Sequence, residues 1–252
     1  MRGPSSVITM LLAVCGALTL TPSDAEARKA KKLELGVGVL GFVNGSFLTE
    51  PDEADKVATI QSGNNSVQAK IPYPGFAGVG GGGGITTSFM YRGAIGAQLD
   101  FLYSVDQGKG EINDVAVEIG QGAFHIPLML KAAIPLRSVR PFLLVGPEFV
   151  IPSDPTVESD LFATPVEGKA DAYVGLGFGL GFDFLLPGEH DLRIPLMIRG
   201  NVNFDVPGGT EGRVTLGDYN PATNELALKS LSTAWQYQAF IMLGFTWNQA
   251  IN

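Results

Sequence analysis

Residues 191–205 read DLRIPLMIRGNVNFD, and they alternate between two kinds of side chain. The even positions, from Leu192 to Phe204, carry no charge, whereas the odd positions, from Arg193 to Asp205, include two arginines, two asparagines and an aspartate. A period of two is the period of a β-strand whose two faces meet different surroundings. The stretch is also about as long as a strand that crosses a bilayer, which needs ~9–11 residues. It therefore predicts a membrane-crossing strand.

Most of the remaining chain repeats this alternation. Seven further strands are predicted at 33–47, 78–91, 94–105, 115–134, 140–151, 171–186 and 233–247. The connections after the second, fourth and sixth of the eight strands are short, and the others are longer, which is typical of antiparallel neighbours with all long loops at one end. An even count lets the first and last strands pair. The sequence thus predicts an all-β fold, an eight-stranded antiparallel up-and-down transmembrane β-barrel.

The N-terminus is predicted to be a secretory signal peptide rather than part of the fold. Arg2 precedes an apolar run at 7–20, and Ala25-Glu26-Ala27 is a small-x-small cleavage site. We expect a signal over 1–27 and a barrel domain over 28–252. An alternative cut before Cys15 would resemble a lipoprotein signal, but the apolar run continues past that cysteine to residue 20.

Composition narrows the function classes further. The only cysteine leaves with the signal, so no disulfide, thiol nucleophile or thiolate metal site is expected in the mature chain. A formal net charge of −8 gives no support to nucleic-acid binding. The chain has 33 glycines and is 45% hydrophobic. A β protein that places glycine on a crowded inner face accommodates both values, whereas a helical domain tolerates so much glycine poorly.

Volume decides which face of the barrel is inside. Eight strands enclose a lumen just wide enough to be filled by side chains. The bulky apolar side chains would overfill it, whereas the glycine-bearing face, with Gly175, Gly177, Gly179 and Gly181, would fit. The apolar face is therefore expected outside, against lipid. The alternative is a soluble lipocalin-like carrier with its apolar face inward.

Two segments carry a family resemblance. FHIPLMLK at 124–131 is similar to the x-I-P-L-L-L-K strand of the OmpA-type, or "porin family", eight-stranded barrels of the Gram-negative outer membrane, and RPFLLVGPE at 140–148 is similar to their x-P-Y-L-x-x-G-P strand. The resemblance implies an outer-membrane location, short turns in the periplasm, long loops at the cell surface and a monomer. It also implies outer-membrane lipid, lipopolysaccharide, the barrel-assembly machinery and periplasmic chaperones as partners. Such barrels usually end on an aromatic residue, whereas here five residues follow Trp247.

The inward face carries the candidate functional residues. Charges inside a narrow barrel must pair and form hydrogen bonds, because unpaired burial is costly. We expect a polar network in the lumen made of Glu34, Asp100, Lys131, Glu148, Asp183, Arg193 and Arg199. The network is predicted to plug the lumen. The alternative is a narrow small-solute channel whose preference is set by Arg193 and Arg199.

No catalytic, cofactor or metal site is predicted. His125 is expected to point inward and His190 to lie in a tight turn, and neither has a partner that the sequence makes evident. The acidic cluster Glu50, Asp52, Glu53 and Asp55 is interpreted as a solvated loop, since its spacing fits no calcium loop. The function expected is therefore non-enzymatic, a structural or surface-interaction role through long extracellular loops.

The long connections are predicted to be polar loops at 51–73, 106–114, 152–170 and 207–231, with short helical turns within 52–60 and 223–229. A bulge is expected near 120–122, where the apolar parity of the strand changes. Aromatic side chains near both strand ends, Trp235 among them, are expected to form interfacial girdles.

Overall fold

The computed structural model describes residues 33–62, 65–70, 73–112, 114–136, 138–160, 166–187, 191–220 and 225–251. The expected signal peptide at 1–27 and the turn residue His190 lie outside these ranges. Over the described residues the chain is almost entirely strand, with one short 3₁₀ helix, η1 (Thr210–Gly212). No helix in these ranges is long and apolar enough to cross a membrane.

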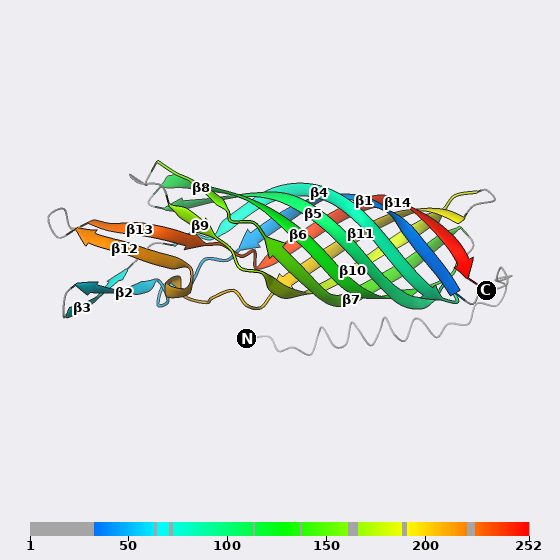
Figure 1. Ribbon diagram of the computed structural model, residues 1–252, viewed down its shortest axis with the longest axis horizontal. Helices are drawn as coiled ribbons and strands as arrows, with labels where there is room; N and C mark the ends of the chain where they lie inside the picture. The colour runs from blue at the N-terminus through cyan, green and yellow to red at the C-terminus, as the bar shows by residue number, and fades with distance from the viewer. Residues whose placement is uncertain are drawn as a thin grey trace.

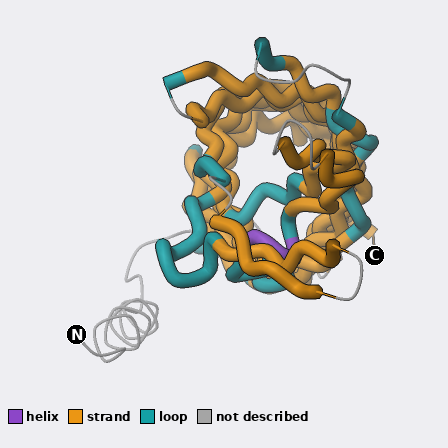
Figure 2. The backbone as a smooth tube through the Cα atoms, turned by 90° about the vertical axis from the view of Figure 1, so that its left-hand side faces the viewer, coloured by secondary structure: helices purple, strands orange, loops and turns teal. Residues whose placement is uncertain are grey.

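Eight long strands form a closed ring (Figures 1 and 2). In chain order they are β1 (Leu33–Leu48), β4 (Phe76–Tyr91), β5 (Ile95–Ile112), β6 (Val115–Ala133), β7 (Val139–Pro152), β10 (Tyr173–Leu185), β11 (Asp191–Asn203) and β14 (Tyr237–Ile251). Each pairs antiparallel with its neighbours, and β1 joins β14 from Leu33 opposite Ile251 to Phe47 opposite Tyr237. The predicted eight-stranded antiparallel barrel is confirmed.

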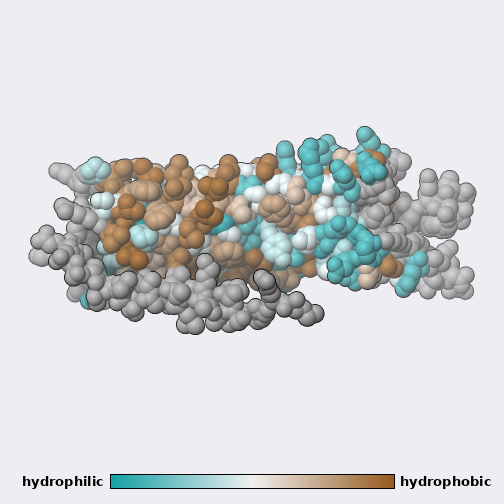
Figure 3. Space-filling model, turned by 180° about the vertical axis from the view of Figure 1, so that it is seen from behind, coloured by the Kyte–Doolittle hydropathy of each residue, from teal (hydrophilic) through white to brown (hydrophobic). Residues whose placement is uncertain are grey.

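The two faces of the ring differ as the alternation predicts. Phe182, Leu196 and Leu243 are 43%, 41% and 57% exposed on the outside. Figure 3 shows hydrophobic side chains along the barrel and hydrophilic ones toward the end with the long connections. An apolar outer surface that surrounds the membrane-length part of the barrel fits hydrocarbon and not water. The lipocalin-like alternative is therefore wrong, because it requires these residues to pack inside.

Inward-facing glycines leave room for large side chains that enter the bore from neighbouring strands. A Cβ atom on Gly175 would lie 2.1 Å from Asn201 Oδ1, and one on Gly181 would lie 2.6 Å from Phe142 Cζ. On β4, a Cβ atom on Gly82 would lie only 1.9 Å from the backbone oxygen of Tyr103. The glycine content thus follows from the narrow bore, which has no space for a side chain at every inward position.

The β5–β6 hairpin corrects two expectations. Residues 106–112, which were expected in a loop, continue β5 and pair with the first part of β6, and one register runs without a shift from Ile95 opposite Ala132 to Ile112 opposite Val115. No bulge interrupts it. The chemical character of the faces inverts instead: Val117 and Ile119 are buried inside, whereas Lys109 and Glu118 pair on the exposed outer face. The hairpin has left the lipid zone, so its outer face is polar.

The other long connections also contain strands, which Figure 1 shows projecting beyond the ring. They are β2 (Val57–Ser62), β3 (Asn65–Lys70), β8 (Thr156–Glu158), β9 (Glu167–Lys169), β12 (Val214–Asn220) and β13 (Glu225–Ser232). Within 52–60 the chain makes one hydrogen-bonded turn, in which Asp55 N donates to the Asp52 carbonyl oxygen at 2.8 Å, and β2 then begins at Val57. The helical turn predicted within 223–229 is wrong for residues 225–229, which belong to β13. β13 pairs antiparallel with β12 and parallel with β9, a distant partner that local sequence does not reveal.

These connections pack at one end of the barrel around an apolar core, which we call the cap core. Its buried members are Leu48, Tyr73, Phe76, Val117, Ile119, Val166, Leu231 and Trp235. Trp235 was expected in a membrane girdle, but it is only 3% exposed. Trp235 precedes β14, so the alternation of that strand does not set the direction of its side chain. The ring packs against Gly108, where an added Cβ atom would lie only 2.4 Å from Cη2 of the tryptophan.

Two buried polar side chains fasten the cap core. The Tyr73 hydroxyl donates to the Ser232 carbonyl oxygen at 3.0 Å, and burial raises the pKa of this phenol. Arg213 donates to the carbonyl oxygens of Pro207 at 2.7 Å and Thr49 at 2.5 Å, and it lies 5.4 Å over the Tyr73 ring. Burial lowers the pKa of this guanidinium. Its hydrogen bonds join the connection that follows β11 to the connection that follows β1. The cap is thus tied together by contacts between segments far apart in sequence.

Candidate functional site

The bore of the barrel is the candidate site, because it collects the charged side chains of the membrane-spanning strands. All seven residues expected in the lumen network lie inside and are between 0% and 7% exposed. Within the described residues they fall into three ion-paired groups at successive heights. Alternation placed their side chains inward, and barrel closure brings strands that are distant in sequence to within contact.

The first group lies near the short-turn end of the bore. Glu34 Oε2 accepts from Arg140 Nη1 at 3.0 Å and from Arg193 Nη2 at 2.8 Å. Arg193 also donates through Nε and Nη2 to both carboxylate oxygens of Asp191, at 3.0 and 2.9 Å. Glu34 on β1 and Arg140 on β7 belong to opposite strands of the ring, so this pair crosses the bore. Sequence reasoning did not include Arg140 or Asp191.

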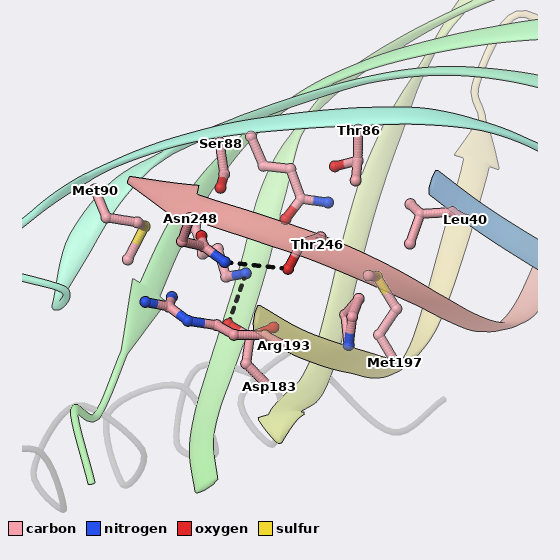
Figure 4. Close-up of a pocket in the computed structure, with 12 residues that line it drawn as sticks. Leu40, Thr86, Ser88, Met90, Asp183, Arg193, Met197, Thr246 and Asn248 are labelled. Carbon is pink, nitrogen blue, oxygen red and sulfur yellow. Dashed lines mark hydrogen bonds and ion pairs between the residues drawn. The ribbon is translucent and has the colours of Figure 1, made fainter. Parts of the chain in front are cut away.

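The second group is Lys131 with Asp183, whose Nζ and Oδ2 atoms are 3.2 Å apart. The ammonium also lies 3.9 Å from the centre of the Phe142 ring. Figure 4 shows Asp183 and Arg193 beside a small cavity, with Asn248 and Thr246 from β14 and Ser88 from β4 around it. The cavity has room for about one water molecule, so it does not amount to a ligand pocket.

The third group occupies the middle of the bore. Arg199 Nη1 lies 3.1 Å from Asp100 Oδ2, and Arg199 Nη2 lies 3.7 Å from Glu148 Oε1. All three side chains are fully buried. Arg199 on β11 and Asp100 on β5 again belong to opposite strands of the eight-stranded ring. The guanidinium also lies 5.2 Å over Phe240 from β14, so it spans the bore and packs against its wall.

His125 joins this group through partners that sequence analysis did not find. Its Nδ1 atom lies 2.8 Å from Glu148 Oε1 and its Nε2 atom 3.0 Å from Ser104 Oγ. Parity alone places Ser104 inward, but only the register of the hairpin, which pairs His125 with Leu102, brings its hydroxyl to the ring. The connectivity is that of a serine–histidine–carboxylate triad. All three residues are 0% exposed, however, so a substrate carbonyl cannot reach the hydroxyl in this structure.

Apolar side chains fill the space between the ion pairs. One buried cluster inside the ring contains Leu40, Phe42, Met90, Leu102, Met129, Ala133, Phe142, Leu144, Met197, Phe240 and Met242. Methionine is suited to irregular gaps because its chain is flexible and unbranched. The bore is therefore a packed interior crossed by ion pairs, and not an open water-filled pore.

Several polar atoms around the middle group have no protein partner. They include Glu148 Oε2, Arg199 Nε and both side-chain amide atoms of Asn201. Buried polar atoms of this kind usually form hydrogen bonds with ordered water.

No metal site is evident in the described residues, because no group of three or more histidine, cysteine, aspartate or glutamate side chains there is arranged to hold an ion.

The acidic segment after β1 also lacks the arrangement of a cation site. Lys56 forms ion pairs with both Glu50 and Glu53, the second at 2.6 Å. These hydrogen bonds, the one to Glu50 foremost, raise the pKa of the lysine. The charges of Glu50 and Glu53 are therefore paired with Lys56 within the same segment.

No known protein family and no curated protein matches this sequence. Solved structures do match. The outer membrane protein OprG of Pseudomonas aeruginosa is 16% identical, with a TM-score of 0.51 over 88% of this chain and 98% of that one. Ail of Yersinia pestis is 12% identical, with a TM-score of 0.37 over 86% and 98% of the two chains. Neisserial surface protein A is 10% identical, with a TM-score of 0.34 over 87% and 97%. The chain is similar to OprG in fold, that of a small outer-membrane β-barrel.

Proposed function

We propose that this protein is a non-enzymatic outer-membrane barrel whose lumen is closed and whose contacts with the surroundings are made by the cap. In this arrangement the short turns face the periplasm and the cap faces the cell exterior. The apolar belt sits in the membrane next to lipid and lipopolysaccharide. The barrel-assembly machinery and periplasmic chaperones are the partners that insertion requires, and the barrel works as a monomer.

The observation that carries this proposal is the pair of ion bridges across the bore. Glu34 reaches Arg140 near one mouth, and Asp100 reaches Arg199 in the middle. A hydrated solute would have to separate both bridges and displace the apolar side chains between them. Breaking a buried ion pair leaves uncompensated charge and costs about 3–5 kcal/mol. The cap core then covers the far end.

The buried Ser104–His125–Glu148 chain supports the non-enzymatic part of the proposal. Acyl transfer needs a site about 3 Å from both the nucleophile and the donors that stabilise an oxyanion. Ser104 Oγ already contacts His125 on one side and Asp106 Oδ2, at 3.1 Å, on the other. The chain is therefore interpreted as a structural network of the bore.

A small-solute channel is the second candidate, favoured by the charged residues that cross the bore. Opening would require Arg199 to leave Asp100, after which the guanidinium would bias the path toward anions. The structure has the closed geometry, so this function needs a second conformation.

Conductance of the purified mature protein in planar bilayers separates the two. A plugged barrel adds no discrete current steps over a wide voltage range. Stable, unitary openings would contradict the closed lumen and favour the channel. Arg199→Ala serves as the sensitised variant: openings seen only in this variant would support Arg199 as the closing element, and openings already present in the unaltered protein would refute it.

A further inference from the structure

The tight turn between β4 and β5 lies at the end of the ring opposite the cap (Figure 1). It consists of Arg92 and Gly93, and Ala94 N donates to the Tyr91 carbonyl oxygen at 3.1 Å. Both turn residues have positive φ angles, 53° for the arginine and 65° for the glycine. Such a turn is of type I′, in which asparagine, aspartate and glycine are preferred. An arginine is strained at this position, so the geometry of the turn gives no reason for it.

Arg92 has no acidic partner among the described residues. Its side chain is exposed, and its guanidinium lies 5.3 Å from the centre of the Tyr91 ring. The carboxylate of Glu34 lies behind the turn, since a Cβ atom on Gly93 would be 3.3 Å from Glu34 Oε1. This carboxylate is already paired with Arg140 inside the bore. The positive charge of Arg92 is therefore not neutralised within the protein.

The apolar outer surface of the barrel extends as far as this turn. Tyr91 pairs with Ile95 across the hairpin and with Leu33 on β1. Leu33 in turn pairs with Ile251 on β14. Tyr91, Ile95 and Ile251 are 50%, 67% and 41% exposed. Because Arg92 directly follows this apolar row in the chain, its guanidinium lies at the edge of the hydrocarbon, at the height of the lipid head groups.

The charges of the two barrel ends differ. Among the described residues of the three short turns Arg92 alone is charged, and the others are 93–94, 134–136, 138 and 186–187. The opposite end exposes many carboxylates, among them Glu111, Asp154 and Glu167. An anionic lipid group is therefore attracted to the short-turn end and repelled by the carboxylates of the cap end.

The chemistry of the pair selects a phosphate. A guanidinium is a planar fork that can donate two parallel hydrogen bonds to two phosphate oxygens. The Tyr91 ring attracts one face of the Arg92 guanidinium through a cation–π interaction, which leaves its N–H edge free to donate.

We infer that Arg92 and Tyr91 form a binding site for the phosphate diester of a phospholipid in the leaflet next to the short turns. Arg92 binds the phosphate, and Tyr91 positions the guanidinium. The site holds the β4–β5 hairpin at a fixed height in the membrane. The inference rests on the proposed orientation, in which these turns face the periplasm and so meet phospholipid rather than lipopolysaccharide.

Carbon–phosphorus dipolar dephasing in solid-state nuclear magnetic resonance tests the contact directly. The mature protein, with its arginines labelled with carbon-13 at Cζ, would be reconstituted in phospholipid vesicles. Arg28 and Arg137, which lie outside the described ranges, would be replaced by lysine. Hydrogen bonds of the guanidinium to phosphate place Cζ about 4 Å from phosphorus, so one signal should dephase. The other labelled arginines are buried and should not dephase, and they are Arg140, Arg193, Arg199 and Arg213.

Two results of this measurement would overturn the site. One is the absence of any dephased arginine signal in the parent. The other is a dephased signal that persists in Arg92→Gln.

Two substitutions of Tyr91 test its positioning role. Tyr91→Leu keeps an apolar side chain but removes the ring, so occupancy of the phosphate contact should fall about two- to fivefold. Tyr91→Phe keeps the ring and should retain the contact. Equal dephasing in Tyr91→Leu and the parent would refute this role.

Arg92→Asn separates backbone strain from lipid contact. Asparagine tolerates the positive φ angle of 53°, so the unfolding temperature should rise in a maltoside detergent, which has no phosphate. In phospholipid vesicles the gain should vanish or reverse, because the phosphate contact is lost. Lys229→Asn, at an exposed position of β13, is the control and should change neither value. The same shift of Arg92→Asn in both media would refute the lipid contact.

Isolated outer membranes distinguish the two sources of phosphate. The phosphate diesters of phospholipid and the phosphate monoesters of lipid A give separate phosphorus signals. Contact of Arg92 with the diester supports the inference. Contact with lipid A phosphate would overturn it together with the proposed orientation, whereas contact with neither would overturn the site alone.

Discussion

Arg199 on β11 and Asp100 on β5 meet at 3.1 Å although their strands lie on opposite sides of the ring. Their contact shows how narrow the bore is, because one arginine side chain spans most of it. Glu34 and Arg140 repeat the relationship near the short-turn mouth at 3.0 Å. Two transverse ion pairs therefore cross the lumen and tie opposite walls of the barrel together.

Removal of Arg199 should destabilise the barrel strongly. Arg199→Met leaves Asp100 and Glu148 buried without their cation, so the free energy of unfolding should fall by about 3–5 kcal/mol. Urea titration in detergent, followed by the gel shift, measures the change. Lys109→Met is the matched control, because its pair with Glu118 is exposed and should contribute at most ~1 kcal/mol. Similar losses in both variants would contradict the account of the bore.

The inner and outer faces of neighbouring strands should respond oppositely to an added methyl group. A Cβ atom on Gly82 would meet the backbone oxygen of Tyr103 at 1.9 Å, which cannot move away without breaking the β4–β5 ladder. Gly82→Ala should therefore cost about 1–3 kcal/mol. Gly41→Ala adds the same atom on the outer face, where the nearest neighbour is 4.0 Å away, and should be nearly neutral. Refolding yield and urea midpoints compare the two, and a harmless Gly82→Ala would disprove the packing argument.

The cap should loosen in alkaline solution. Burial raises the pKa of Tyr73, so the folded cap favours the neutral phenol. The stability this gives is fully present below the phenol's ordinary pKa of ~10 and is lost as the pH rises above it. In a Trp247→Phe background, Trp235 fluorescence should report the opening between pH 9 and 12.

Tyr73→Phe should reduce the amplitude of this alkaline transition. We assign the remaining amplitude to Lys56, because its hydrogen bonds to Glu50 and Glu53 raise its pKa. The stability that this lysine gives is also lost as the pH rises. An unchanged transition in Tyr73→Phe would show that the phenol does not hold the cap.

Arg213 should be needed for the cap but not for the barrel. Arg213→Met removes the hydrogen bonds to Pro207 and Thr49 while keeping an apolar chain over Tyr73. We expect faster thermolysin cleavage in the connections that form the cap, with a protected barrel fragment of unchanged gel mobility. Lys229→Met, at an exposed position of β13, is the control. Loss of the barrel fragment would mean that cap and barrel unfold together.

The ring could be predicted from sequence because its signal is local. Strands such as β10 alternate strictly, and a narrow lumen forces the glycine face inward, so the inward position of Arg199 and Asp100 followed from parity and volume. The bulge predicted near 120–122 is wrong for a related reason. The prediction assumes that lipid lies outside along the whole strand. Above the membrane the polar face turns outward, which reverses the pattern without any shift in register.

The cap and the partners of His125 could not be predicted, for a different reason. Trp235 packs over Gly108, and β13 pairs with β9, so these contacts join residues whose separation in sequence gives no pattern. The short segments β8 and β9 look loop-like on their own and become strands through partners that are distant in sequence, β6 and β13. Ser104 and Glu148 reach His125 only through the registers of two hairpins, which parity alone does not set.

The orientation of the two faces in β11 is tested most directly by a nitroxide scan. Single cysteines at each position from 192 to 204 would be spin-labelled in the mature protein in lipid bilayers, and collision with dissolved oxygen would be measured at each one. Oxygen concentrates in hydrocarbon, so a lipid-facing outer surface predicts a period of two, with high collision rates at Leu196 and Ile198 and low rates at Met197 and Arg199. The reverse phase, or low oxygen access at every position, would show that the apolar face does not meet lipid.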